Sequence, residues 1–392
     1  MSRPILADGE RVTVIVFYGD HASSAPERLV SGACAAAARD TVELALACPL
    51  VERVVVATNS APFAAAIGDQ ERVVVEVDPP GQPGQRFHFG NALLRVIDQH
   101  GVRTPLYFGA GAAPLLRDAT LEAICQRLLG STNTVVTNNR ASADFYGFSP
   151  PSALRRIPLP ETQDNSLPYL LARPGVGLTA DVLEPAIQTS LDIDTPTDVA
   201  CLAVQSALKP HLRTFIETQQ VDTSRLEAAM PLLLREQTQV TLIGRVNTQL
   251  WGTRPSDIPG SKRIFAEERM MKSFGRDAPG KAKSLLGDLY QAIGPTRFFD
   301  RLAEYSDVVF FDTRVLFFHL GLDLSPADRF SVDLGDVAAI SDPIARDFTA
   351  AALACEIPVI LGAHNIVSGG LWALVQEAWD RSDAGLLPPQ VG

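Results

Sequence analysis

Lysine is absent from the first half of this sequence, since all five lysines lie at or after Lys209. Cysteine is also scarce: the five cysteines are widely spaced and form no C-x-x-C pair, which argues against a zinc knuckle and against a disulfide framework. No apolar run approaches the roughly 20 residues of a membrane span, and no charged segment followed by an apolar stretch opens the chain. We therefore expect a cytoplasmic protein without a membrane partner.

The charge balance is acidic, with a formal net charge of -11 at pH 7 and a pI of about 5.1. Proteins that bind the phosphate backbone of nucleic acids usually carry a basic patch, so we expect no nucleic-acid partner. A local cationic site for a small phosphorylated ligand is compatible with this total. The 392 residues, 46% of them hydrophobic, can form two cores. We predict domains over residues 1–208 and 209–392.

The first half alternates between short β-branched runs and helical stretches. Strands are predicted at 11–18, 54–58, 73–77, 105–109 and 134–137, and helices at 26–47, 62–67, 89–100, 121–129 and 196–208. A strand at a sheet edge is predicted at 145–148, and a helical turn at 181–184. This alternation predicts an α/β fold with a doubly wound, mostly parallel sheet. Its ligand site should lie in the loops after Tyr18, Thr58 and Phe108, at the carboxyl ends of strands.

The second half repeats the α/β pattern and predicts a second, smaller α/β domain. Strands are predicted at 240–246, 263–267, 307–312 and 358–361. Helices are predicted at 213–236, with a break at Pro231, and at 282–305, 344–355 and 371–379.

The sharpest motif is the segment DIDTPTDV at 192–199. Thr195 and Pro196 predict the start of a helix, whose positive end suits Asp198. Asp192 and Asp194 stand two apart in an extended segment and so face the same side. Two carboxylates placed in this way can bind a hard cation such as Mg²⁺, and a plain helix cap with solvated acids is the alternative.

This segment resembles the D-x-D-T-P-x-D signature near the end of MobA-like nucleotidyltransferase domains, and the resemblance covers about residues 10–205. It implies a fold like that of the nucleotide-diphospho-sugar transferases. It also implies Mg²⁺-dependent transfer of a nucleotidyl group from an NTP to a small phosphorylated or carboxylated acceptor. Asp192 and Asp194 would hold the metal, and Asp194 would be catalytic. Self-association into a homo-oligomer stays open.

Two other stretches resemble the family but depart from it. Residues 109–116 (GAGAAPLL) resemble a D-x-P-L-L turn in which alanine or glycine replaces the metal-binding aspartate. The loop after the first strand carries Gly19, His21 and Arg28 where the family places several glycines, an arginine and a lysine. Gly19 and His21 would contact the triphosphate, and Arg28 would be catalytic by offsetting its charge.

The missing aspartate and lysine define an alternative. Each such group is worth roughly 3–4 kcal/mol of barrier, so two losses would slow transfer by roughly 10⁴-fold. A catalytically degenerate nucleotide-binding or scaffold protein is therefore a second hypothesis. Asn138 and Asn139 follow a predicted strand and would hold a nucleobase or acceptor, or else serve as turn residues.

Polar residues also follow three predicted strands of the second half. They include Glu267 after one strand, Asp312 and Arg314 after the next, and His364 after the last. Asp312 and His364 would form an orienter and base pair if they lie close together. Activity in the C-terminal domain is therefore a third hypothesis, and its alternative is that buried Asp and Arg residues link the domain internally.

Overall fold

The computed structural model describes residues 11–78, 87–159, 164–247, 257–272 and 274–387. The chain forms two compact units. Unit 1 comprises residues up to 21, 33–190 and 209–212, and unit 2 comprises 22–32, 191–208 and 213 onward. The division therefore falls within helix α1 (Ala25–Ala47) and within helix α8 (Pro210–Gln219). Residues 191–208 group with unit 2, and the boundary at residue 208 stays a prediction of the sequence.

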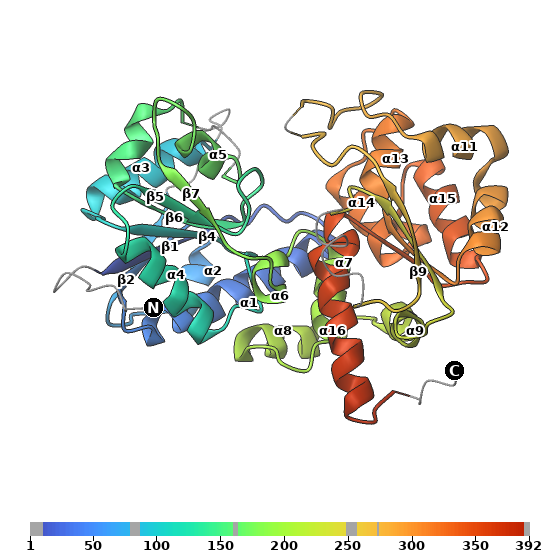
Figure 1. Cartoon of the computed structure of the whole chain (residues 1–392), viewed down its shortest axis with the longest axis horizontal. Helices are drawn as coiled ribbons and strands as arrows, with labels where there is room; N and C mark the ends of the chain where they lie inside the picture. Colours follow the sequence, from blue (N-terminus) through green and yellow to red (C-terminus); the bar gives the residue numbers. More distant parts are fainter. Residues whose placement is uncertain (1–10, 79–86, 160–163, 248–256, 273, 388–392) are drawn as a thin grey trace. The chain divides into compact units, whose positions relative to one another are not determined.

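Unit 1 is built on a seven-stranded sheet in the order β3-β2-β1-β4-β6-β5-β7 (Figure 1). The strands are β1 (Val12–Tyr18), β2 (Val51–Thr58), β3 (Val73–Val77), β4 (Pro105–Gly109), β5 (Thr134–Thr137), β6 (Phe145–Ser149) and β7 (Thr179–Val182). Only β6 runs antiparallel to its neighbours among these pairings. The predicted mostly parallel α/β sheet is thus confirmed.

Helices cover both faces of this sheet, which is why its central strands are apolar on both sides. Val14 and Val16 of β1 pack in one core with α1, α2 and α4, while Ile15 packs in the other with α3, η1 and α5. The helices that follow α1 are α2 (Ala61–Ile67), α3 (Phe89–Gln99), α4 (Asp118–Leu129), η1 (Pro151–Arg156), α5 (Leu167–Leu171) and α6 (Ile187–Ser190).

Two predictions for unit 1 are wrong. The 145–148 strand was expected at a sheet edge, but β6 lies between β4 and β5 and is buried. Gly147 permits this placement, because a Cβ there would overlap a methyl group of Leu128. Where a helical turn was expected at 181–184, residues 181 and 182 instead end strand β7, which pairs with β5, and residues 183 and 184 belong to no element. Pairing to a neighbouring strand decided this short segment, whose own pattern is ambiguous.

Unit 2 is built on a four-stranded sheet in the order β11-β10-β8-β9, with all three pairings parallel. The strands are β8 (Gln239–Gly244), β9 (Ser261–Ala266), β10 (Val308–Asp312) and β11 (Val359–Gly362). The helices are α7 (Pro196–Ala203), α9 (Ser224–Leu233), α11 (Leu285–Ile293), α12 (Pro295–Tyr305), α13 (Thr313–His319), α14 (Pro326–Leu334), η2 (Val337–Ala339), α15 (Pro343–Ala354), η3 (His364–Val367) and α16 (Gly369–Asp383).

The second, smaller α/β sheet is therefore confirmed, with local differences. Pro231 does not break the helix, since it lies inside α9, which ends two residues later. The break falls before α9 instead, at Gln220 with φ 49°. Helix α7 ends at Ala203, earlier than the predicted 208. Among the described residues, no helix combines the length and the apolarity needed to cross a membrane.

Candidate metal site

The strand order of unit 2 fixes where a ligand should bind. Strands β8 and β10 are neighbours, with β9 on one side and β11 on the other, so the chain order reverses between them. In open α/β sheets the ligand crevice lies outside the carboxyl ends of the strands at such a point. The registers pair Ala266 with Gly244 and Asp312 with Gly362, so the strand ends are aligned along one edge of the sheet.

A buried ion pair joins the two strands at this point. Arg245 follows β8 and donates from Nε to Oδ2 of Asp312 at 2.6 Å and from Nη2 to Oδ1 at 3.0 Å. Burial raises the pKa of Asp312, but the charge and hydrogen bonds of Arg245 and the charge of Arg314 together hold that pKa below its ordinary value. Gly244, with φ 110°, makes room for the pair, because a Cβ there would lie 2.7 Å from Asp312.

Next to this pair lies a group of metal-ligand type. Single donor atoms of Asp192, Asp194 and His364 all lie within 4.8 Å of one another. His364 Nε2 is 3.8 Å from Asp192 Oδ1, and His364 Nδ1 is 3.8 Å from Asp194 Oδ2. Asn365 is buried and donates from Nδ2 to Asp192 Oδ1 at 2.7 Å, which orients that carboxylate. Asp194 is 54% exposed and so is accessible from solvent.

The sequence positions these acids through a helix cap. Thr195 and Asp198 form a capping box at the start of α7, as the motif predicts. Asp198 Oδ2 accepts hydrogen bonds from the backbone N–H of Asp194 at 3.0 Å and of Thr195 at 2.7 Å. Thr197 Oγ1 donates to the carbonyl of Leu361 at 2.7 Å, which ties α7 to the end of β11. The segment 192–198 is thereby held against the strand that leads to His364.

The charge state of His364 suits a ligand. Burial lowers the pKa of His364, the charge of Asp194 raises it, and the guanidinium of Arg245 lowers it again, with a net downward direction. The neutral imidazole is the form that binds metal. Two carboxylates and one neutral imidazole therefore fit a divalent cation.

Of the other polar residues predicted in the second half, Asp312 lies at the carboxyl edge of the unit 2 sheet and Arg314 lies in the interior of unit 2. Asp312 does not orient His364, because its carboxylate binds Arg245, and His364 lies beside Asp192 and Asp194. Arg314 is buried and binds Asp333 through two hydrogen bonds of 3.1 and 2.5 Å. That pair links α13 to α14 internally.

The predicted nucleotide-binding residues lie at the carboxyl edge of the unit 1 sheet. Gly19 follows β1, and His21 is exposed in the same loop. The Asn138 amide donates to Asp144 Oδ2 at 2.6 Å and to the carbonyl of Thr189 at 2.9 Å. Asn139 Oδ1 accepts from the N–H groups of residues 141 and 142 at 3.0 and 3.2 Å. Both asparagines thus stabilise their own loop, and their ligand roles stay predictions.

A tyrosine and an aspartate meet beside the end of β4. Tyr107 Oη donates to Asp164 Oδ2 at 2.6 Å, and that oxygen lies 3.7 Å from where a Cβ of Gly109 would be. The sequence pattern did not single out Tyr107, because an aromatic residue inside a buried strand is expected to pack in the core. Asp164 thus brings a carboxylate to the end of a strand whose own loop, 109–113, has none.

The predicted catalytic arginine lies in unit 2. Arg28 stands in the first turns of α1 and donates from Nη1 to the carbonyl of Ser23 at 3.0 Å. Arg28, Asp192 and Asp194 therefore belong to unit 2, and Gly19, His21, Asn138 and Asn139 belong to unit 1. The catalytic, nucleotide and metal roles of these residues stay predictions.

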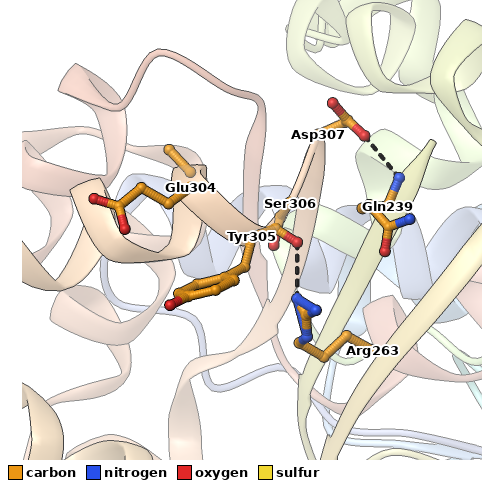
Figure 2. A pocket seen from close by; sticks show the side chains of 7 residues that line it. Gln239, Arg263, Glu304, Tyr305, Ser306 and Asp307 are labelled. Carbon is orange, nitrogen blue, oxygen red and sulfur yellow. Dashed lines mark hydrogen bonds between the residues drawn. The ribbon is translucent and has the colours of Figure 1, made fainter. Parts of the chain in front are cut away.

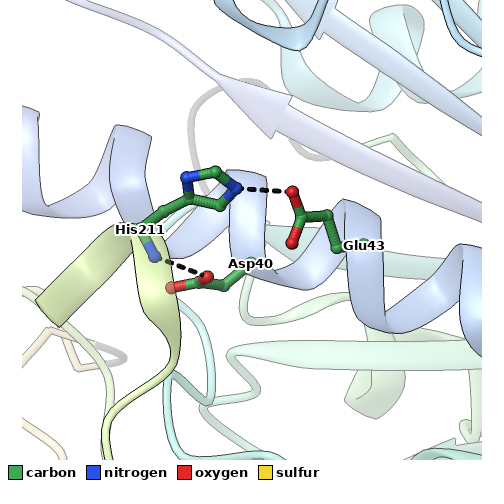
Figure 3. A group of neighbouring side chains, drawn as sticks. All are labelled: Asp40, Glu43 and His211. Carbon is green, nitrogen blue, oxygen red and sulfur yellow. Dashed lines mark hydrogen bonds and ion pairs between the residues drawn. The ribbon is translucent and has the colours of Figure 1, made fainter. Parts of the chain in front are cut away.

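A second group of two carboxylates and a histidine occurs in unit 1, formed by Asp40, Glu43 and His211 (Figure 3). Asp40 accepts from the backbone N–H of His211 at 3.0 Å and of Leu212 at 2.9 Å, and so caps the start of α8. His211 Nε2 lies 2.5 Å from Glu43 Oε1. This group fastens α8 to α1, because both oxygens of Asp40 are used by the helix start.

A pocket of about 240 Å³ lies at the opposite edge of the unit 2 sheet, where β8 and β10 begin. Figure 2 shows Arg263 reaching toward Tyr305, whose carbonyl accepts from Arg263 Nη1 at 2.8 Å. The guanidinium also lies 5.3 Å from the centre of the Tyr305 ring. This pocket is thus at the amino ends of the strands, away from the edge where parallel sheets bind ligands.

No protein-family model matches the sequence, and no curated protein matches it. Solved structures that resemble the chain cover about half of it. They include a cytidylyltransferase from Leptospira borgpetersenii serovar Hardjo-bovis (strain JB197), with 16% identity over 54% of this chain and 94% of that chain and a TM-score of 0.38. They also include CMP:2-keto-3-deoxy-manno-octonic acid synthetase complexed with CTP, with 13% identity over 48% of this chain and 94% of that chain and a TM-score of 0.33.

A third is the complex of Rv0371c with manganese from Mycobacterium tuberculosis H37Rv, with 16% identity over 48% of this chain and 95% of that chain and a TM-score of 0.32. The chain is therefore similar over about half of its length to cytidylyltransferases, which the predicted NTP-transferase resemblance anticipates. At these identities the likeness concerns the fold alone.

Proposed function

We propose that the protein is a nucleotidyltransferase-type enzyme that requires a divalent cation bound to Asp192, Asp194 and His364. The observation that supports this proposal is the meeting of two carboxylates and an imidazole within 4.8 Å at the carboxyl edge of the unit 2 sheet. The substrates would be an NTP and a small phosphorylated or carboxylated acceptor, with release of pyrophosphate.

Each residue of the proposed site would have a separate role in binding the ion and the NTP. When bound, the ion would supply positive charge to phosphate oxygens of the NTP. Asp194 is the exposed ligand and would face the substrate. Asn365 orients the Asp192 carboxylate by donating a hydrogen bond to it. Arg28, in the same unit as the metal group, would offset phosphate charge.

The donor set also bears on which ion binds. Mg²⁺ takes oxygen ligands and keeps several waters, whereas imidazole suits transition ions. His364 therefore favours Mn²⁺ over the Mg²⁺ that the sequence predicts, since Mn²⁺ accepts both carboxylate and imidazole ligands.

Isothermal titration of the full chain with Mn²⁺ and with Mg²⁺ tests the site, and titration with each of the four NTPs in the presence of the ion tests the substrate. We expect one Mn²⁺ site that Asp194→Ala and His364→Ala both abolish. Asp300→Ala is the matched control, because it removes an exposed carboxylate from α12 of the same unit. Equal Mn²⁺ affinity in the wild type and in Asp194→Ala would overturn the proposal.

A second candidate function is a nucleotide-binding protein without turnover. It is favoured by the carboxylate-free loop 109–113 and by the two asparagine side chains that serve their own loop in unit 1. Tight binding of one NTP, with no pyrophosphate released across a panel of phosphorylated and carboxylated acceptors, would select this candidate.

A further inference from the structure

Two Arg–Asp pairs of unit 2 have fully buried carboxylates, and they use the guanidinium differently. Arg314 binds Asp333 through both terminal nitrogens, and its Nη1 also donates to Thr313 Oγ1 at 2.9 Å. Arg245 binds Asp312 side-on instead, through Nε at 2.6 Å and Nη2 at 3.0 Å. The edge of the Arg245 guanidinium that is formed by Nη1 and Nη2 is therefore left open by its carboxylate partner.

The unused donors of Arg245 can be counted. A guanidinium carries five N–H groups in one plane, and Asp312 takes two of them, so three remain. Nη1 has no hydrogen-bond partner among the described residues, and it is not one of the enclosed polar atoms. The Arg245 side chain is 19% exposed, compared with 9% for Arg314. Arg245 is thus mostly enclosed, but its open edge is accessible to a ligand.

The open edge also has a fixed orientation, unlike that of an arginine on the surface. Asp312 caps the start of α13 and accepts the backbone N–H of Arg245 at 3.1 Å, in addition to the two guanidinium hydrogen bonds. The backbone and the side chain of Arg245 are therefore both held by one buried carboxylate. A side chain held in this way loses little further rotamer entropy when a ligand binds.

The position of Arg245 in the sheet is that of a ligand-binding residue. Arg245 directly follows β8, at the point where the chain order reverses between β8 and β10. Ligands of parallel sheets bind outside the carboxyl ends of the strands at such a point. Helix η3, which begins at His364, packs against both β8 and β10. The open guanidinium edge and the metal group therefore belong to the same edge of the unit 2 sheet.

Other charged groups act on Arg245 besides its partner. Burial lowers the pKa of Arg245, whereas Asp312 and the charges of Asp194 and Asp277 raise it above its ordinary value. Asp194 and Asp277 are exposed and oppose an incoming anion. Arg269 donates from Nη1 to the carbonyl of Arg245 at 3.3 Å and brings a positive charge beside it. A cation bound by Asp194 would offset that carboxylate, so we expect it to strengthen anion binding at Arg245.

We propose that Arg245 binds a phosphoryl group of the ligand through the open Nη1–Nη2 edge of its guanidinium. The planar fork matches two oxygens of a phosphoryl group, and the hydrogen bonds that form are charge-assisted. A phosphoryl group is favoured over a carboxylate, because its larger negative charge is attracted more strongly to the guanidinium and to a bound cation. This inference deepens the proposed function and rests on it for the identity of the ligand, whereas the anion site itself needs no bound cation.

Phenyl phosphate and benzoate are suitable probes, because they share a ring and differ in the anion. Isothermal titration of the full chain with each probe, with and without Mn²⁺, measures their binding. We expect Arg245→Lys, which keeps a charge beside Asp312 but loses the planar fork, to weaken phenyl phosphate binding by about 10-fold or more. Arg314→Lys makes the same change in the other pair and should alter the affinity by less than about twofold. Mn²⁺ should strengthen the binding of phenyl phosphate to the wild type.

Thermal unfolding should show that both lysine variants are folded. A double variant, Arg245→Met with Asp312→Asn, covers the case in which Arg245→Lys does not fold. It removes the guanidinium together with the charge that the guanidinium neutralises, and the asparagine can still cap α13. We expect this double variant to bind phenyl phosphate no more tightly than Arg245→Lys. Arg301→Ala, which breaks an exposed pair on α12, is a second control and should bind phenyl phosphate like the wild type.

Separate readouts distinguish this inference from the proposed function. Mn²⁺ titration without a probe should give the same affinity in Arg245→Lys as in the wild type. If Mn²⁺ does not bind but phenyl phosphate affinity still depends on Arg245, the proposed metal site fails and the anion site stands. The inference would be overturned by a wild type that does not bind phenyl phosphate, by equal affinity in the wild type and Arg245→Lys, or by equal losses in Arg245→Lys and Arg314→Lys. Benzoate binding as tight as that of phenyl phosphate would contradict the phosphoryl assignment.

Discussion

Two groups in this protein offer the same donors, two carboxylates and one histidine, in different surroundings. In unit 1, both oxygens of Asp40 accept backbone N–H groups at the start of α8, and Glu43 pairs with the histidine. In unit 2, Asp194 is exposed and Asp192 is oriented by Asn365 at the carboxyl edge of a parallel sheet. The comparison teaches that the donor types alone do not define a metal site. The other hydrogen bonds of the donors decide whether they serve the fold or a ligand.

The largest expected effect concerns the support of the unit 2 edge. Asp312→Ala should lower the free energy of unfolding by about 3–5 kcal/mol, because it leaves the Arg245 guanidinium without its counter-ion in a low-dielectric place. Chemical denaturation measures this loss. The double variant Arg245→Ala with Asp312→Ala should lose less than the sum of the two single variants. Strict additivity would show that the pair is not coupled.

The next effect separates the two groups directly. His364→Ala should weaken Mn²⁺ binding by more than about 100-fold, since even outer partners of metal ligands are worth about 10- to 100-fold. His211→Ala in unit 1 should leave Mn²⁺ stoichiometry and affinity unchanged. Titration of both variants with Mn²⁺ tests this difference. Loss of a Mn²⁺ site in His211→Ala would show that the unit 1 group also binds metal.

A third prediction compares two asparagines. Asn365→Ala should weaken Mn²⁺ binding by about 10- to 100-fold, because it frees the Asp192 carboxylate from its orienting hydrogen bond. Asn138→Ala should leave Mn²⁺ binding unchanged and lower stability by about 1–3 kcal/mol, because Asp144 loses a partner. Loss of stability in both variants with unchanged Mn²⁺ affinity would assign Asn365 a role in the fold alone.

The smallest effect is expected at the surface of unit 1. Glu43→Gln should lower stability by only about 0–1 kcal/mol, because its pair with His211 is solvent-exposed. Asp40→Asn should cost more than Glu43→Gln, since Asp40 is buried and caps a helix. Equal thermal stability of the two variants would contradict the capping role.

Local patterns predicted most of the fold. Short, mostly apolar runs located β1, β3 and β4 within about one residue of their observed ends, because strands in a sheet covered on both faces are largely apolar. The segment 192–198 likewise gave the cap of α7 correctly, since capping depends on residues three positions apart. Where pairing partners decided the outcome, as for β6 and β7, the sequence prediction was wrong.

The sequence by itself determined that this is a two-part α/β protein, and it singled out Asp192 and Asp194 as acids that face one side. Only the tertiary structure decided what meets them. His364 lies 170 residues after Asp194 and approaches it because α7 is tied to the strand that leads to His364. Spacing along a chain governs caps and strands, whereas a site depends on contacts between segments that only folding brings together.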